Sequence, residues 1–224
     1  MSTQTTISEE MVVLLHGIGR TSGSMKAVAA HLADQGYAVF NVDYPSRSQS
    51  IAELAAGLHQ QLLSEGIAGF SKLHFVTHSM GGLLVRELVK QCRPETLGRV
   101  VMLAPPNQGS EVADFLAGNV LFKLIYGPAG QDLKTGNEAF GPVDFQLGVI
   151  AGTKSIDPIS SLILSGPNDG KVTVENTKVD GMAGHLTLPV NHTFLMRNET
   201  VLKQVALFLA TGAFDHGLNK AKIA

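Results

Sequence analysis

The chain has 224 residues and 44% hydrophobic content, enough to fill one sizeable core but too short for two domains of ordinary size. Its net charge is -2 and no run of like charges occurs, which argues against nucleic acid as a partner. No apolar stretch reaches the ~18 residues that a membrane span needs, so we expect no such span.

Cys92 is the single cysteine, so no internal disulfide can form, as is usual in a reducing compartment. No second ligand residue lies near it in sequence, and we expect neither a catalytic nor a metal-binding role for it. Residues 1–10 are polar and acidic and lack the basic start and apolar centre of a signal peptide. We therefore expect a cytoplasmic protein.

Strand-like apolar runs alternate with helical spacing along the chain. Residues 12–19 form an apolar run that ends in a glycine turn, and further strands are predicted at residues 37–43, 73–78, 99–104, 145–151 and 186–190. The first helix has one apolar face made of Met25, Val28, Ala29 and Leu32, with Ser22 or Ser24 available as its cap.

Two more helices follow the same spacing. One has an apolar face made of Ile51, Leu54, Ala55, Leu58 and Leu62, and the closing helix, capped by Asn198, carries Val201, Leu202, Val205, Ala206 and Leu209. Strand–helix alternation throughout predicts an α/β fold with a doubly wound, mostly parallel sheet of about six strands. Its ligands should bind at the carboxyl ends of the strands.

The segment Phe75-Val76-Thr77-His78-Ser79-Met80-Gly81-Gly82 carries the strongest functional signal. A serine between an apolar strand and a helix is held on a strained corner, with its hydroxyl exposed and the next backbone N–H at a helix N-terminus. Gly81 allows the strand and helix to approach closely, whereas Thr77 stands where the G-x-S-x-G pattern has its first glycine. A Ser-Met-Gly-Gly string can equally cap a helix, so this segment alone leaves both interpretations open.

Three further segments stand in a telling order around Ser79. His16-Gly17 ends the first strand, Asp169 lies in a tight turn of residues 166–170, and His192 follows the last predicted strand. The order Ser, Asp, His is the one that α/β-hydrolases use. Four pieces in this order indicate a serine hydrolase far more strongly than one motif does.

Together these segments resemble the α/β-hydrolase superfamily, and within it the bacterial lipases. Residues 106–116 resemble the lipase pattern of a proline turn followed by Gly-Ser and Ala-Asp, and residues 168–172 and 191–192 match the lipase acid and base segments. The resemblance covers about residues 11–211. It implies one α/β-hydrolase domain over residues 1–224. Residues 105–144 break the strand–helix alternation, and they form either a small cap over the catalytic edge or an ordinary packed helix with a loop.

The resemblance also implies the chemistry. Ser79 is the expected nucleophile, His192 the base that takes its proton, and Asp169 the acid that orients the imidazole. The backbone N–H groups of Ile18 and Met80 would bind the oxyanion. This mechanism needs no metal and no organic cofactor.

Several assignments have rivals. His185 is the competing base, although the sequence places it before the last strand, and Asp157, Asp180 and Asp114 compete with Asp169. Each of these aspartates has an ordinary interpretation as a turn or surface carboxylate. Arg20 could contact a polar head group or form a salt bridge to the scaffold.

Residues 105–144 bear on the substrate, which we expect to be a small-molecule ester with an apolar acyl part. The insertion holds the candidate acyl-binding residues Leu116, Leu121, Phe122, Leu124 and Ile125. So short an insertion forms a shallow cap more often than a deep tunnel, which favours short-to-medium acyl chains. The expected function is a carboxylesterase or lipase. The alternatives are a thioesterase or acyltransferase with the same triad, and a non-catalytic ligand-binding relative.

Overall fold

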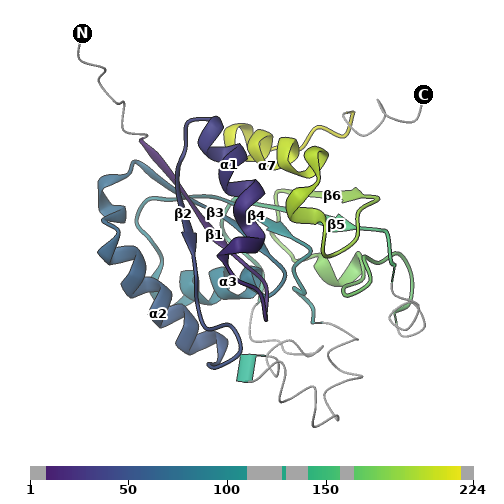
Figure 1. Cartoon of the computed structure of the whole chain (residues 1–224), viewed down its shortest axis with the longest axis horizontal. Coiled ribbons are helices and arrows are strands. Elements are labelled where there is room, and N and C mark those ends of the chain that lie inside the picture. Colours follow the sequence, from purple (N-terminus) through teal and green to yellow (C-terminus); the bar gives the residue numbers. More distant parts are fainter. Residues whose placement is uncertain (1–8, 110–127, 130–140, 157–163, 218–224) are drawn as a thin grey trace.

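The computed structural model describes residues 9–109, 128–129, 141–156 and 164–217 (Figure 1). Six strands form one sheet in the order β2-β1-β3-β4-β5-β6, and every neighbouring pair is parallel. The strands are β1 (Glu10–Leu15), β2 (Ala38–Val42), β3 (Lys72–His78), β4 (Leu97–Leu103), β5 (Leu147–Gly152) and β6 (Gly184–Leu188). The prediction of a parallel sheet of about six strands is confirmed.

Helices cover both faces of the sheet, as a doubly wound fold requires (Figure 1). On one face, α2 (Ile51–Ser64) and α3 (Gly81–Cys92) pack against the strands, and on the other face α1 (Lys26–Asp34) and α7 (Glu199–Thr211) do so. The described residues also contain the short 3₁₀ helices η1 (Ser22–Met25), η2 (Ile67–Gly69), η4 (Glu175–Thr177) and η5 (Leu195–Arg197).

Helix starts show where local sequence decided the structure. Ser50 begins α2 with a reciprocal capping box to Glu53, and Asn198 caps α7 by accepting from two backbone amides, as predicted. The prediction that Ser22 or Ser24 caps the first helix is wrong. The Ser22 hydroxyl donates to Asp43, and η1 precedes α1 without a side-chain cap.

The strand order reverses between β1 and β3, and in doubly wound sheets ligands bind at the carboxyl ends of the strands at such a point. The chain leaves β1 toward α1 on one face and leaves β3 toward α3 on the other. Helix α3 begins very close to β1, because a Cβ added at Gly81 would lie 2.7 Å from the Leu15 carbonyl oxygen. Glycine is therefore required at this position.

Two parts of the prediction remain untested by the fold. Most of the expected cap insertion, residues 105–144, lies outside the described residues, as do all five candidate acyl-binding residues. None of the helices in the described ranges combines the length and apolar character needed to cross a membrane.

Candidate active site

Ser79 stands at the corner between β3 and α3. Its backbone φ is +54°, a left-handed conformation that non-glycine residues rarely adopt and that costs about 1–3 kcal/mol. The Ser79 amide donates to the Leu103 carbonyl (2.8 Å), which fixes the corner to β4. A Cβ added at Gly17 would lie 3.1 Å from the Ser79 Cβ, so the serine faces the turn after β1.

Thr77 explains how the chain does without the first glycine of the usual pattern. Its side chain is buried inside β3, where it pairs in register with Leu15 and Met102. The close approach falls instead on Gly81, next to the backbone of β1, and on Gly82, where a Cβ would lie 2.9 Å from the Pro105 side chain. The corner therefore forms with a threonine in place.

Asp169 and His192 are hydrogen-bonded to each other. His192 Nδ1 lies 2.6 Å from Asp169 Oδ2, and the His192 amide donates to the Asp169 carbonyl (3.0 Å). The second carboxylate oxygen, Oδ1, accepts from the amides of Lys171 and Val172 at 2.9 Å each. Because the carboxylate accepts, Nδ1 carries the proton and Nε2 keeps a lone pair, which is the tautomer that a general base needs.

His78 connects the serine corner to this pair. Its Nε2 donates to the His192 carbonyl (3.0 Å), and the two imidazole rings lie 4.7 Å apart between centroids. Burial first, and the charge of His192 second, hold the pKa of His78 well below its ordinary value. A neutral His78 therefore anchors the backbone of His192 next to Ser79. The sequence placed His78 beside Ser79 but gave no signal for this bond.

The turn of residues 17–20, the oxyanion turn, closes the site on the β1 side. The Arg20 amide donates to the Gly17 carbonyl (3.2 Å), and the Gly19 amide donates to Ser46 Oγ (3.0 Å). Within the described ranges, the amide of Ile18 donates to no protein acceptor. The Met80 amide, at the N-terminus of α3, likewise donates to no protein acceptor in these ranges. Their role as oxyanion donors stays a prediction.

A buried aromatic pair supports this turn from below. His16 stacks on Tyr44 with ring centroids 4.1 Å apart, and the Tyr44 hydroxyl donates to the His16 carbonyl. His16 Nδ1 donates to the Gly17 carbonyl (2.8 Å), and burial lowers the pKa of His16. The sequence contained no pattern that pointed to Tyr44.

The rival residues are placed as follows. His185 lies inside β6, not before the last strand as predicted, and its Nε2 lies 2.9 Å from the Thr177 hydroxyl. Asp180 is an exposed turn residue. Asp114 and Asp157 lie outside the described residues.

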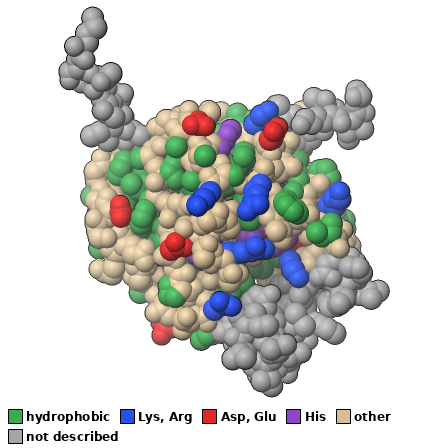
Figure 2. All heavy atoms as spheres, viewed as in Figure 1, with side chains coloured by type: hydrophobic (Ala, Val, Ile, Leu, Met, Phe, Trp, Pro, Cys, Tyr) green, Lys and Arg blue, Asp and Glu red, His purple; other side chains and the backbone are tan. Residues whose placement is uncertain are grey.

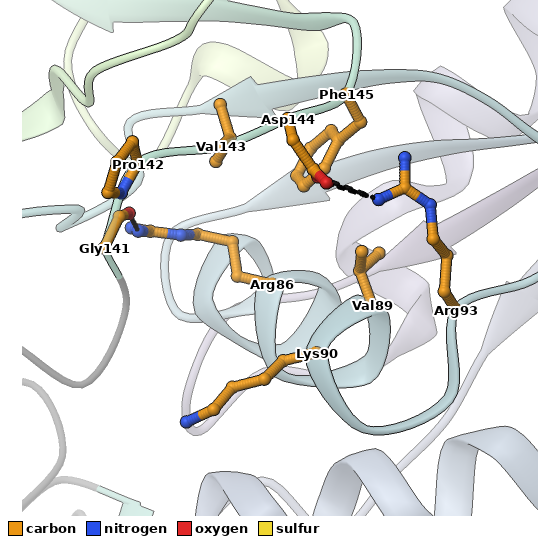
Figure 3. Close-up of a pocket in the computed structure, with 9 residues that line it drawn as sticks. All are labelled: Arg86, Val89, Lys90, Arg93, Gly141, Pro142, Val143, Asp144 and Phe145. Carbon is orange, nitrogen blue, oxygen red and sulfur yellow. Dashed lines mark hydrogen bonds and ion pairs between the residues drawn. The ribbon is translucent and has the colours of Figure 1, made fainter.

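One pocket of about 330 Å³ lies along the second half of α3 and residues 141–145 (Figure 3). Its buried Arg86 donates to the Gly141 carbonyl (2.5 Å) and to Asn107 Oδ1 (3.0 Å). Arg93 pairs with Asp144 at 2.8 Å across the same pocket. Neither Ser79, Asp169 nor His192 lines it, so this pocket is separate from the candidate site.

Among the residues that the structure describes, no three His, Cys, Asp or Glu side chains are placed to hold a metal ion.

Sequence comparison identifies one family. A family model described as "Domain of unknown function (DUF7379)" matches residues 2–127. No curated protein matches the sequence.

Structure comparison identifies the fold. The Bacillus licheniformis lipase BlEst2 in its mature form is 21% identical, with a TM-score of 0.74 and 92% of each chain covered. The metagenomic carboxyl esterase MGS0156 is 18% identical, with a TM-score of 0.67, 85% of this chain and 66% of that chain covered. The Paleococcus ferrophilus monoacylglycerol lipase is 18% identical, with a TM-score of 0.61, 92% of this chain and 96% of that chain covered. These likenesses show the α/β-hydrolase fold, as the sequence motifs predicted.

Proposed function

Because this chain belongs to the DUF7379 family, whose description assigns no activity, we propose its function from the site itself: hydrolysis of carboxylic esters by a serine nucleophile. Ser79 would attack the ester carbonyl, with His192 as general base and Asp169 as the group that orients it. The observation that carries this proposal is the 2.6 Å bond between His192 Nδ1 and Asp169 Oδ2. This bond orients the imidazole at the edge of the sheet where Ser79 stands, which supports a role as base.

The steps follow from the positions of the groups. His192 Nε2 takes the Ser79 hydroxyl proton as the serine oxygen bonds to the carbonyl carbon, and the carbonyl oxygen gains negative charge. The amides of Ile18 and Met80 would bind this charge, each worth roughly 3 kcal/mol in comparable sites. His192 then protonates the departing alcohol. Water, deprotonated by the same imidazole, releases the acid and regenerates Ser79.

The strained corner supports the role of Ser79. A left-handed serine between a strand and a helix has its hydroxyl lifted clear of the sheet and the next amide pointed the same way. The named lipases and esterases of the same fold cleave esters, which favours an ester over an amide as the substrate here.

Transfer of the acyl group to another acceptor uses the same residues. A thioesterase or an acyltransferase would differ only in the leaving group or in the nucleophile that releases the acyl-enzyme. We therefore propose the ester hydrolase and treat these activities as rivals. Faster turnover of CoA thioesters than of simple esters would identify a thioesterase. Transfer of the acyl group to alcohols in preference to water would identify an acyltransferase.

The direct test is covalent labelling. A fluorescent alkyl phosphonate should label the wild-type protein at Ser79, identified by peptide mass spectrometry, and 4-nitrophenyl esters of short-to-medium acyl chains should be hydrolysed. Ser79→Ala should remove both activities, whereas Ser46→Ala, which alters the neighbouring turn, should keep labelling. Labelling of any other serine, or turnover by Ser79→Ala at the wild-type rate, would overturn the proposal.

A further inference from the structure

Two arginines border the oxyanion turn, one from the turn itself and one from the loop after β2. The Arg20 guanidinium lies 3.5 Å from the hydroxyl of Thr193, the residue directly after the proposed base, at the outer limit of a hydrogen bond. The stem of Arg47 lies over the turn, since a Cβ added at Gly19 would be 3.8 Å from Arg47 Cδ. Both arginines are exposed at the edge where the proposed site opens.

Neither guanidinium pairs with a carboxylate in the part of the chain that the structure describes. Two carboxylates at this edge are already held by other groups. Asp43 accepts from the amide and the hydroxyl of Ser22, at 2.6 and 2.7 Å. Asp169 is bonded to His192 and to two backbone amides. Neither carboxylate is therefore bonded to Arg20 or Arg47 in the described ranges.

Three other arginines behave differently. Each has its guanidinium group bonded to the scaffold: Arg86 to Asn107 and Gly141, Arg93 to Asp144, and Arg99 to Gln146 and the carbonyls of Leu209 and Ala210. Figure 3 shows Arg86 turned toward Gly141 and Arg93 turned toward Asp144. These guanidinium groups stabilise the fold, whereas within the described residues Arg20 makes only its long bond to Thr193 and the Arg47 guanidinium makes none.

The charge of Arg20 already reaches the site. After burial and His192, it contributes to lowering the pKa of His78, whose ring touches that of His192. Figure 2 shows further Lys and Arg side chains gathered across the middle of the face that carries α1 and α7, with few acidic ones between them. Exposed positive charge raises the local concentration of anions, and guanidinium groups bind carboxylate and phosphate bidentately.

Building on the proposed ester hydrolysis, we propose that Arg20 and Arg47 form an anion-recognition rim, and that the preferred esters carry a carboxylate or phosphate close to the scissile bond. The rim selects the substrate and takes no part in the bond changes. The charged group can belong to the acyl side or to the alcohol side of the ester.

Two matched substrate pairs separate these sources. Mono-4-nitrophenyl adipate and 4-nitrophenyl hexanoate differ by a carboxylate on the acyl side. The compounds 4-hexanoyloxybenzoate and its methyl ester differ by a carboxylate on the alcohol side. The readout is the ratio of kcat/KM for the anionic ester to that for its neutral partner, measured at low and at high salt.

The variants are Arg20→Gln, Arg47→Gln and the double variant, with Arg197→Gln as the matched control, because Arg197 is an exposed arginine five residues after the proposed base. In the double variant we expect the ratio to fall at least about tenfold for one pair, with neutral esters unchanged and the effect smaller at high salt. An unchanged ratio for both pairs, or an equal fall in Arg197→Gln, would overturn the rim.

A second readout does not depend on hydrolysis. In the Ser79→Ala background, titration calorimetry gives the Kd of each intact ester, and the arginine substitutions should weaken only the anionic ones. If the wild-type protein hydrolyses none of the esters but binds the anionic ones through these arginines, the proposed function fails and the rim stands. Equal binding of charged and neutral esters in every variant would remove the rim while leaving hydrolysis untouched.

Discussion

The two ends of the central strands treat polar groups in opposite ways. At the amino ends of β1 and β3, Glu10 binds the Lys72 ammonium (2.6 Å) and His74 Nε2 (3.2 Å), and His74 Nδ1 accepts from the Arg99 amide (2.8 Å). Both nitrogens of this buried histidine are therefore bonded.

At the carboxyl ends, comparable groups are left strained or unpaired. Ser79 and Ala104 both have positive φ at strand ends. The atoms Nδ1 of His78 and Nε2 of His16 are buried without a hydrogen-bond partner in the described ranges. Paired polar groups stabilise a fold, whereas strain and unused hydrogen-bonding capacity gather where a substrate is handled. Substitutions at the two ends should therefore change different properties, activity at one and stability at the other.

The largest effect should come from Asp169→Asn. The asparagine oxygen can still accept from the amides of Lys171 and Val172, which turns its NH₂ group toward His192 Nδ1. His192 must then carry its proton on Nε2 and cannot accept one from Ser79. We expect kcat/KM to fall about ten-thousandfold in ester hydrolysis assays.

Asp180→Asn, at an exposed turn, is the matched control and should keep full activity. The free energy of unfolding of the Asp169→Asn protein should lie within about 1 kcal/mol of the wild-type value, because the backbone contacts of this residue remain. Turnover at the wild-type rate in Asp169→Asn would contradict the assignment of Asp169 as the acid of the triad.

His78→Leu should give a smaller loss of activity. It removes the donor to the His192 carbonyl, so the base is less well positioned, and we expect kcat to fall about 10–100-fold with little change in KM. His78→Gln can place an amide donor at the same point and should recover part of the loss. If both variants lose only stability and keep kcat per folded molecule, His78 serves packing alone.

His74→Ala tests the other end of the sheet. It breaks both bonds of the buried imidazole and leaves the Arg99 amide without its acceptor, so the free energy of unfolding should fall by about 2–4 kcal/mol. Urea denaturation measures this change. Lys72→Ala, which removes an exposed ion pair, should lower it by about 1 kcal/mol or less. In both variants kcat/KM of the folded protein should stay near wild type, and a large loss would erase the contrast between the two ends.

The last prediction concerns pH. Burial lowers the pKa of His16, His74 and His78 in the folded protein, so below the unfolded value of about 6.5 the unfolded chain binds more protons. Stability should therefore fall as pH drops from 7 to 5, by at most about 1.4 kcal/mol per pH unit for each histidine that stays neutral. Urea midpoints across this range measure the slope, which should be shallower in His74→Ala. A flat profile would contradict the burial argument.

The sequence predicted the sheet and the order of the site segments, because apolar runs and helical spacing report burial directly. The apolar face predicted for α2 is buried at every predicted position, and the Asn198 cap is present. The bond between His192 and Asp169 joins two of the residues that the lipase-like segments singled out.

Other features were not predictable, since they depend on contacts between distant segments. The stacking of Tyr44 under His16, the bond from His78 to His192 and the placement of Arg47 over Gly19 join residues that no local pattern relates. The start of the first helix was misjudged because Ser22 binds Asp43, which follows β2. The candidate acyl-binding residues of the expected insertion, residues 105–144, lie outside the described ranges.

The strand order also governs how this molecule acquires its site in time. Gly17, Ser79, Asp169 and His192 follow four different strands, and the β1–β3 pairing alone joins residues more than 55 positions apart in sequence. Such distant pairings form slowly, because the entropy cost of closing a long loop comes before the stabilising contacts form. Helices α1 to α3 can form while the four segments are still apart. During refolding, secondary structure should therefore return first and ester turnover last.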